Sequence, residues 1–331
     1  MRNSKIAGVG HYVPERVVTN QDLEKMMDTS DEWIVERTGI HTRHWITEND
    51  TLSGMAHKAS NKALERAGKS AEDIDFIVFA ALDGDHQFPG GGCFLQEKMG
   101  IPGVPALDIR NACSGFIYGL SVADQFIKTG KYQNILLVGA EVQSTSLDLS
   151  TEGRDVSVIF GDGAGAALIT PAEDENKGVL TTHIYADGRF GDKLWVDAPS
   201  VNDQPRLTKE LLDTRRIYPY MEGRFVFKHA VTRFPEVINE ALEVAGLKAE
   251  DLDLVIPHQA NKRITEAVAH KLGMGLDKVY SNIEKYGNTT AASIPIALSE
   301  VFEEGKLKEN DLVCLASFGA GFTWGSALIR W

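Results

Sequence analysis

Cys113 is the residue most suited to nucleophilic chemistry. It lies between an apolar stretch at 105–109 and a helical pattern over 114–128, so its thiol is expected at a strand-to-helix turn. A helix N-terminus favours the thiolate, and the position therefore predicts a lowered thiol pKa and a nucleophile. A buried, inert cysteine is the alternative that the position alone leaves open.

Two further side chains could assist such a nucleophile. His258 follows the apolar stretch 252–256, and the carboxyl ends of parallel strands are where α/β proteins bind ligands. It could act as a base or a hydrogen-bond donor, or simply bond to nearby backbone. Asn288 lies in a loop, 286–293, that leads into a helix, where it could donate to an oxyanion or cap the helix.

Two glycine-rich segments need separate interpretations. Residues 317–325 join two predicted strands and could present a backbone N–H to a developing negative charge, although a tight turn is the simpler explanation. Residues 161–166 match a dinucleotide-binding pattern, but an apolar stretch broken by Pro171 follows them instead of a helix. We interpret these glycines as a turn between strands.

The elements that position these residues occur twice. Residues 71–78 match 249–256, and the helical segments before them, 63–68 and 241–246, match at the same offset. That offset places Cys113 on Ala291, three positions from Asn288. A period this long indicates two copies of one domain.

Each copy predicts the same succession of helices and strands. A helix (55–67; 234–245) is followed by a buried strand (76–80; 254–257), and more helices and strands alternate after it. This succession indicates an α/β fold with mostly parallel sheets. The polar stretch 171–177 is the best candidate for the join, which gives halves 1–172 and 173–331.

Composition narrows the class of protein. The chain has 331 residues, of which 43% are hydrophobic and 24% charged, as in globular proteins. The net charge of −13 argues against a nucleic-acid partner. Three cysteines without a CxxC pair argue against disulfides and a metal site, and favour the reducing cytoplasm. We expect no secretory signal and no membrane association, because the apolar runs are too short.

Taken together, the motifs resemble β-ketoacyl-acyl-carrier-protein synthase III, a condensing enzyme of the thiolase superfamily. The resemblance runs from about residue 5 to residue 331. Its most specific parts are residues 31–34, 37–40, 112–115, 160–164, 258–261, 287–289 and 321–325.

The resemblance implies a fold, an assembly and a reaction. The fold is the five-layered α-β-α-β-α thiolase fold, and the assembly is a homodimer. A triad of Cys113, His258 and Asn288 would condense an acyl-CoA starter with malonyl-acyl carrier protein through an acyl-Cys113 intermediate. Ala320 would complete the oxyanion hole, Phe318 would exclude water beside the nucleophile, and no cofactor or metal would be needed.

The resemblance also implies substrate contacts. The residues expected to bind coenzyme A and its pantetheine arm are Trp33, Arg37, Arg154, Gly223, Ala260 and Asn261. Lys262, Arg263 and Lys271 would form a basic patch for the carrier protein, and Phe88 would reach the partner subunit's acyl pocket. The loop 82–92 is unusually acidic and the segment 197–222 unusually long, with a short helix expected at 207–213. Both lie where acyl choice is set, so we expect a preference other than acetyl.

Other activities remain compatible with the sequence. One is condensation in a specialised polyketide, quinolone or head-to-head hydrocarbon pathway. Another is acyl transfer or thioester hydrolysis without condensation, which the presence of His258 and Asn288 argues against. A non-catalytic binding subunit would not require all three triad residues.

Overall fold

Two mixed β-sheets organise the chain, whose computed structural model describes residues 3–331. In the first sheet the strand order is β1 (Ser4–Tyr12), β7 (Gly163–Pro171), β6 (Ile135–Glu141), β4 (Phe76–Ala80) and β5 (Ala106–Ile109). In the second it is β11 (Leu254–Pro257), β12 (Leu312–Gly319), β13 (Thr323–Arg330) and β8 (Gly178–Ala186). Strand β4 is parallel to both β5 and β6, and β11 is parallel to β12, while the other pairs are antiparallel.

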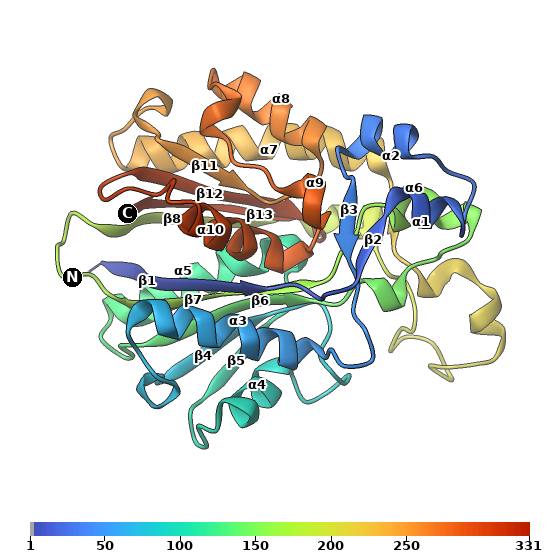
Figure 1. Cartoon of the computed structure of the whole chain (residues 1–331), viewed down its shortest axis with the longest axis horizontal. Coiled ribbons are helices and arrows are strands. Elements are labelled where there is room, and N and C mark those ends of the chain that lie inside the picture. The colour runs from blue at the N-terminus through green and yellow to red at the C-terminus, as the bar shows by residue number, and fades with distance from the viewer. Residues whose placement is uncertain (1–2) are drawn as a thin grey trace.

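Helices form three layers around these sheets (Figure 1). The central layer, between the sheets, contains α5 (Gly115–Lys128) and α10 (Ser293–Glu303). The outer face of the first sheet is covered by α3 (Leu52–Ala67) and α4 (Gly91–Met99). The outer face of the second is covered by α7 (Gly223–Val244) and α8 (Lys262–Leu272). The predicted α/β class and its five layers are confirmed. The prediction of mostly parallel sheets is wrong, because only three of the seven strand pairs in these two sheets are parallel. The short loop between β12 and β13, for example, allows only antiparallel pairing.

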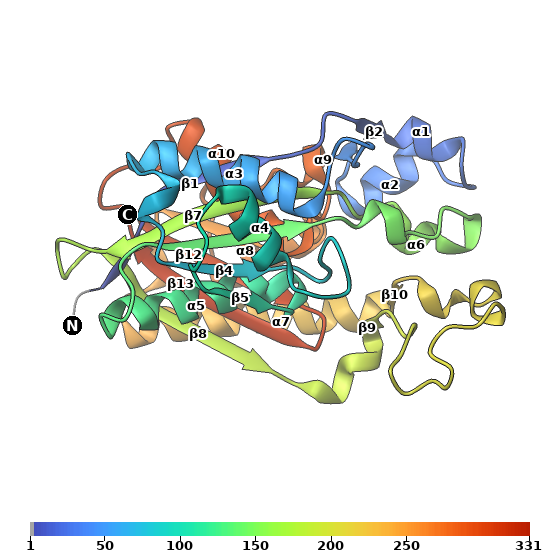
Figure 2. The same cartoon turned by 90° about the horizontal axis from the view of Figure 1, so that it is seen from below.

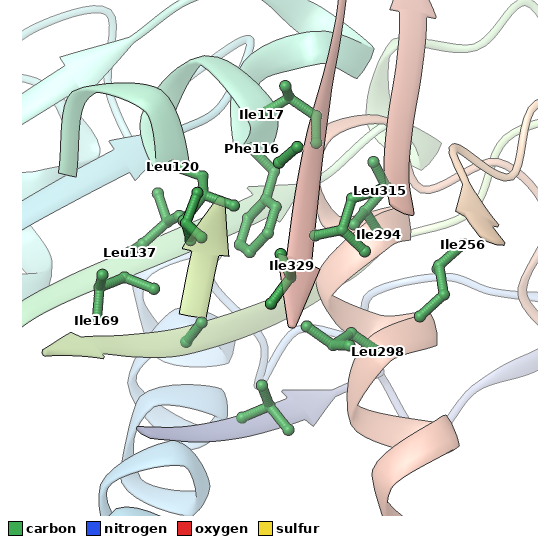
Figure 3. Packing of buried hydrophobic residues seen from close by; sticks show 14 of the residues in the cluster. Phe116, Ile117, Leu120, Leu137, Ile169, Ile256, Ile294, Leu298, Leu315 and Ile329 are labelled. Carbon is green, nitrogen blue, oxygen red and sulfur yellow. The ribbon is translucent and has the colours of Figure 1, made fainter. Parts of the chain in front are cut away.

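The central helices bury apolar side chains against both sheets (Figure 3). Phe116 and Leu120 of α5 lie beside Leu137 of β6, while Ile294 and Leu298 of α10 lie near the second sheet. All five are at most 1% exposed. The two halves therefore share one core, which fixes the N-terminal ends of α5 and α10 relative to each other.

Local signals explain where several helices begin and end. The Thr51 hydroxyl accepts a hydrogen bond from Gly54 N at the start of α3, and Asn261 caps α8 in the same way. Gly68 and Gly273 end these helices in the left-handed conformation that glycine tolerates best.

Helix α7 is longer than predicted. The sequence predicted a helix over 234–245, but α7 begins at Gly223 and passes through Pro235. Val226, Ala230 and Phe234 are spaced four residues apart and are buried on the face toward the second sheet. That burial outweighs the backbone hydrogen bond that proline cannot donate.

The smaller elements gather at one end of the layered body. They are β2 (Val17–Thr19), α1 (Asn20–Glu24), α2 (Asp31–Thr38), β3 (Thr42–His44), α6 (Arg154–Ser157), β9 (Leu194–Trp195), β10 (Tyr220–Met221) and α9 (Ile283–Tyr286). The segment between β9 and β10 projects from this end (Figure 2) and exposes Val201, Leu207 and Leu212. The helix predicted at 207–213 is only a 3₁₀ turn, Glu210–Asp213.

The chain passes from the first sheet to the second between Pro171 and Gly178. The predicted polar join occupies this connection, and division into halves 1–172 and 173–331 stays a prediction. None of the helices within residues 3–331 has the length and apolarity required to cross a membrane.

Candidate active site

Cys113 lies in a short 3₁₀ turn, Ala112–Ser114, immediately before α5. We call this the cysteine turn. Ala112 has a φ of 45°, a left-handed conformation that is uncommon outside glycine and often found at functional sites. The Ser317 hydroxyl of β12 donates to the Cys113 carbonyl oxygen over 2.6 Å, so the second half fixes the turn.

The expected lowering of the thiol pKa is not observed. Burial, followed by the charge of Glu141, raises the pKa of Cys113 to about 12, because thiolate formation is unfavourable away from water. Hydrogen bonds from the backbone of Cys113 and Ala320 act in the opposite direction. In the free protein the thiol is therefore protonated at neutral pH, and its proton must be removed during the reaction.

The glycine-rich loop between β12 and β13 closes over the sulfur. A Cβ on Gly319 would lie 2.6 Å from Cys113 Cβ and 3.1 Å from Sγ, so only glycine allows this approach. The next residue, Ala320, points its backbone N–H to the sulfur. Phe318 is buried beside them and packs on Phe322 at 4.9 Å between ring centroids.

His258 follows the last residue of β11, and its backbone N donates to Ala316 O on the neighbouring strand over 2.8 Å. Ring atom Nδ1 lies 2.6 Å from Ser293 Oγ. Nε2 is thus the ring nitrogen left for a ligand. Burial lowers the pKa of His258 to about 3, so the imidazole is neutral at physiological pH.

Asn288 precedes a second 3₁₀ turn, Thr290–Ala292, which leads into α10. We call this the asparagine turn. Asn288 Oδ1 accepts from Thr290 N over 2.9 Å, which leaves the two Nδ2 hydrogens free to donate. Thr290 has a φ of 51°, so the asparagine turn contains the same backbone outlier as the cysteine turn.

Cys113, His258 and Asn288 line one cavity of about 870 Å³ that draws residues from both halves. The other predicted residues on its wall are Trp33, Arg37, Arg154, Gly223, Ala260, Asn261, Arg263 and Phe318. Because the N-terminal ends of α5 and α10 meet inside the molecule, residues far apart in sequence converge on this cavity.

A tryptophan between two arginines marks the cavity mouth. The guanidinium carbon of Arg37 lies 4.3 Å from the Trp33 ring centroid, and that of Arg154 lies 5.3 Å away. A flat aromatic base could stack here, with cations ready for phosphates. Asn261 uses its side chain structurally: Nδ2 donates to Arg37 O and Oδ1 accepts from Arg263 N.

The residues predicted for carrier docking lie at both ends of α8. Arg263 lies on the cavity wall and Lys262 packs beside Gly39, both at the start of α8. Lys271 lies in the last turn, about 12 Å along the helix axis from Arg263. Phe88 is 84% exposed on the loop before α4, away from any described apolar contact.

The geometry brings forward four residues to which the sequence assigned no role. Arg224 lines the cavity mouth, Ser293 contacts His258, and Gly319 makes room for the cysteine. Glu141, at the end of β6, is 1% exposed and contributes to the Cys113 pKa. The sequence did contain one signal for Glu141, which is a charged residue at the end of an otherwise apolar strand.

The dinucleotide-like glycines do not open a helix. Gly163 is the first residue of β7, and a Cβ on Gly165 would lie 2.7 Å from the Pro295 side chain. These glycines let β7 pass close to α10. The prediction of a turn between strands at residues 161–166 is wrong, because α6 and a short turn precede these residues and Gly163–Ala166 already lie within β7.

Comparisons with known proteins agree with this geometry. The family model described as 3-oxoacyl-[acyl-carrier-protein (ACP)] synthase III matches residues 107–188, and its C-terminal counterpart matches 242–331. A β-ketoacyl-[acyl-carrier-protein] synthase III of Salmonella arizonae is 46% identical over 329 residues, which is 99% of each chain.

Solved structures extend the likeness to three dimensions. The crystal structure of 3-oxoacyl-[acyl-carrier-protein] synthase III from Aquifex aeolicus VF5 superposes with a TM-score of 0.91 at 46% identity, covering 99% of this chain and 100% of that one. The priming β-ketosynthase of the R1128 polyketide pathway gives 0.90 at 32% identity, covering 99% and 96%. The identity over the full length shows that this chain belongs to the β-ketoacyl-[acyl-carrier-protein] synthase III family.

Proposed function

We propose that this chain, a condensing enzyme of the acyltransferase class, joins an acyl-CoA starter to malonyl-acyl carrier protein at the start of fatty-acid synthesis. The observation that carries the proposal is the convergence of Cys113, His258 and Asn288 on one cavity, with a thiol, a neutral imidazole and an amide donor.

Acylation comes first. Cys113 Sγ attacks the thioester carbonyl of acyl-CoA, and the oxyanion is held by the backbone N–H groups of Cys113 and Ala320. Because the thiol starts protonated, neutral His258 takes its proton at Nε2 and passes it to the departing coenzyme A sulfur. The products are acyl-Cys113 and free coenzyme A.

Decarboxylation and condensation follow. The malonyl thioester loses CO₂, and the electron pair of the broken C–C bond forms an enolate at the thioester carbonyl. Ser293 Oγ can accept from or donate to Nδ1, so after acylation neutral His258 exchanges to its Nε2–H tautomer. Nε2–H and Asn288 Nδ2 then donate to the enolate oxygen, and the step uses no metal or cofactor. The carbanion attacks the acyl carbonyl, and the Cys113 thiolate leaves. Phe318, buried beside the sulfur, keeps water from the acyl-enzyme.

Substrate recognition follows from the cavity mouth. Trp33 stacks on the adenine while Arg37 and Arg154 pair with phosphates, and Gly223, Ala260 and Asn261 line the path of the pantetheine arm. An acidic carrier protein docks at the same mouth, on Arg224 and Arg263, with Lys262 beside Arg263 at the start of α8. Lys271, in the last turn of α8, would contact only the periphery of the carrier protein.

The active unit is a homodimer in this proposal. Strand β5 is the edge of its sheet and pairs on one side with β4, and Leu107 on it is 37% exposed. An unpaired edge strand favours pairing with a second copy. Phe88, exposed on the neighbouring loop, would then enter the partner's acyl pocket. Sedimentation of the wild type and Leu107→Lys tests this, and a monomeric wild type would contradict it.

A cytoplasmic location and a starter other than acetyl complete the proposal. Cys93, Cys113 and Cys314 form no disulfide in the described residues, as expected of a reducing compartment. Turnover of acetyl-CoA that equals or exceeds that of every longer acyl-CoA would refute the starter preference.

Intact-protein mass after mixing with acyl-CoAs of rising chain length tests the central proposal. We expect an acyl mass on the wild type, absent from Cys113→Ala, that malonyl-acyl carrier protein discharges as a β-ketoacyl product. No acylation by any acyl-CoA would overturn it.

The likeness to the R1128 priming enzyme favours one second candidate, condensation in a specialised pathway. In that case the acyl mass would form but malonyl-acyl carrier protein of fatty-acid synthesis would not discharge it.

A further inference from the structure

A buried acid behind the nucleophile has no part in the mechanism above. Glu141 is the last residue of β6 and is 1% exposed. Buried carboxyl groups are costly unless they are well hydrogen-bonded, so its contacts indicate what it stabilises. They involve loops from both halves of the molecule.

On one side the carboxyl group bonds to the first half. Leu82 N donates to both carboxyl oxygens, over 3.2 and 3.3 Å, at the start of the loop that carries Phe88. Gln143 Nε2 donates to Oε2 over 3.3 Å. Glu141 thus fixes the backbone where β4 ends and the acidic loop begins.

On the other side it contacts the second half. The backbone N–H of Ala291, the middle residue of the asparagine turn, faces the Glu141 carboxyl group and lowers its pKa, as a donor to the ionised form does. Strand β6 approaches this turn so closely that a Cβ on Gly139 would lie 2.3 Å from Ala291 O. Thr290 N, the preceding donor, bonds to Asn288 Oδ1, so Glu141 and Asn288 hold successive N–H groups of one turn.

The asparagine turn needs such support. Thr290 is β-branched and has a φ of 51°, which is a strained conformation for that residue type. Loss of the contact with Ala291 would leave a buried N–H unsatisfied and free the turn to relax. Any relaxation would move Asn288, whose Nδ2 must point at the malonyl thioester oxygen.

We propose that Glu141 is a positioning residue that holds the asparagine turn in place for decarboxylation, and that it does so beside the nucleophile. The inference rests on the proposed function, since it concerns the same cavity. The proposal predicts different effects on the two half-reactions. Acylation depends on the cysteine turn, whereas condensation depends also on the asparagine turn, which Glu141 supports.

The charge of Glu141 allows a second, independent measurement, because it changes the pKa of the Cys113 thiol. Burial raises its pKa to about 8, and the charge of exposed Asp83, which is paired with Arg110, acts in the same direction. Its negative charge in turn raises the pKa of Cys113. As pH rises through about 8, Glu141 ionises and opposes formation of the Cys113 thiolate.

The test compares Glu141→Gln with the wild type in three assays. These are the rate of acyl-Cys113 formation, the rate at which the acyl-enzyme is discharged by malonyl-acyl carrier protein, and the pH profile of Cys113 alkylation by iodoacetamide. The amide replaces one carboxyl oxygen by an NH₂ group, which cannot accept from a backbone N–H, so the bonding of Leu82 N to both oxygens is lost and the support of Ala291 is weakened. Asp124→Asn, at a buried carboxyl group on α5 bonded to Ser4 and Lys128, is the matched control.

We expect discharge by Glu141→Gln to fall about tenfold while acylation changes less than about threefold. Alkylation at about pH 9 should become faster, because a neutral side chain no longer opposes the thiolate. A destabilised fold would also speed alkylation, but it would expose buried Cys314 as well as Cys113, so peptide mass spectrometry of both cysteines distinguishes the two causes. Asp124→Asn should leave both the ratio of the half-reactions and the alkylation profile unchanged.

An unchanged ratio of the half-reactions, or an alkylation profile like that of the wild type, would overturn the proposal. If Glu141→Gln does not fold, Glu141→Asp decides: its carboxylate should keep the wild-type alkylation profile yet discharge more slowly, and equal discharge would overturn the idea. Failure of the wild type to be acylated would instead refute the proposed function. The alkylation assay requires no acyl substrate, so it would still report on Glu141 in that case.

Discussion

The cysteine turn and the asparagine turn occupy corresponding places in the two halves and have nearly the same backbone. Each is a 3₁₀ turn before a central helix, and each contains a left-handed residue, Ala112 with φ 45° and Thr290 with φ 51°. When the halves are aligned, Cys113 falls on Ala291. One turn therefore presents the nucleophile, while its counterpart has a methyl group at that position.

The surrounding residues differ in a complementary way. Arg110, the counterpart of Asn288, is exposed and pairs with Asp83, whereas Asn288 is 7% exposed and lines the cavity. Strand β4 ends in Ala80, while β11 is followed by His258. The first half has kept the group that forms the covalent bond, and the second has kept the groups that stabilise an enolate. One backbone design thus serves two successive steps.

Replacing the nucleophile should have the largest effect. Cys113→Ala should abolish acylation and lower condensation by about 10⁴-fold or more, because no other thiol contacts the Ala320 N–H group. Adding Ala291→Cys to this variant should not restore acylation. Mass spectrometry after incubation with acyl-CoA measures both, and an acyl adduct on residue 291 would show the two turns to be interchangeable.

Removing the donor of the second half should separate the two steps. We expect Asn288→Ala to acylate at close to the normal rate but to condense about 10²–10³-fold more slowly, since one enolate donor is lost. Single-turnover assays of each step decide this. Normal condensation would eliminate the proposed role of Asn288.

Closing the space beside the cysteine should have a smaller effect. Gly319→Ala places a Cβ 2.6 Å from Cys113 Cβ and should slow acylation about tenfold by displacing the sulfur. The matched control is Gly188→Ala, where a Cβ meets no atom within 4 Å. Equal acylation rates in the two variants would show that the loop can yield.

The smallest effect is expected in the pH dependence of the free energy of unfolding. Burial lowers the pKa of His258 to about 3, below its value of about 6.5 in the unfolded chain. The unfolded state therefore binds the extra proton first, and His258 costs stability as pH falls from about 6.5 toward 3. Chemical denaturation between pH 4 and pH 7 should show a shallower slope for His258→Gln, and an identical slope would contradict a neutral, buried imidazole.

The sequence patterns were enough to predict the duplication and the α/β class, and the resemblance to the family predicted the meeting of Cys113, His258 and Asn288. Apolar periodicity and the internal repeat can both be recognised in a single sequence, without structural information. The thiol pKa was wrong because it depends on burial by β12, which approaches Cys113 from the far half. The start of α7 was missed because a tertiary contact overrides the local effect of Pro235. Glu141 and Ser293 matter only through partners distant in sequence, so spacing could not reveal them.

The arginines at the cavity mouth give the molecule an uneven electrostatic field. The chain carries a net charge of −13, yet Arg37, Arg154, Arg224 and Arg263 all line the opening. The negative net charge repels an approaching polyanion at long range, whereas the four arginines attract it close to this opening, which favours encounters in a productive orientation. At physiological ionic strength, salt screens both the repulsion and the attraction beyond about 8 Å. Added salt should therefore lower the rate of ligand binding more steeply than the rate of the chemical steps.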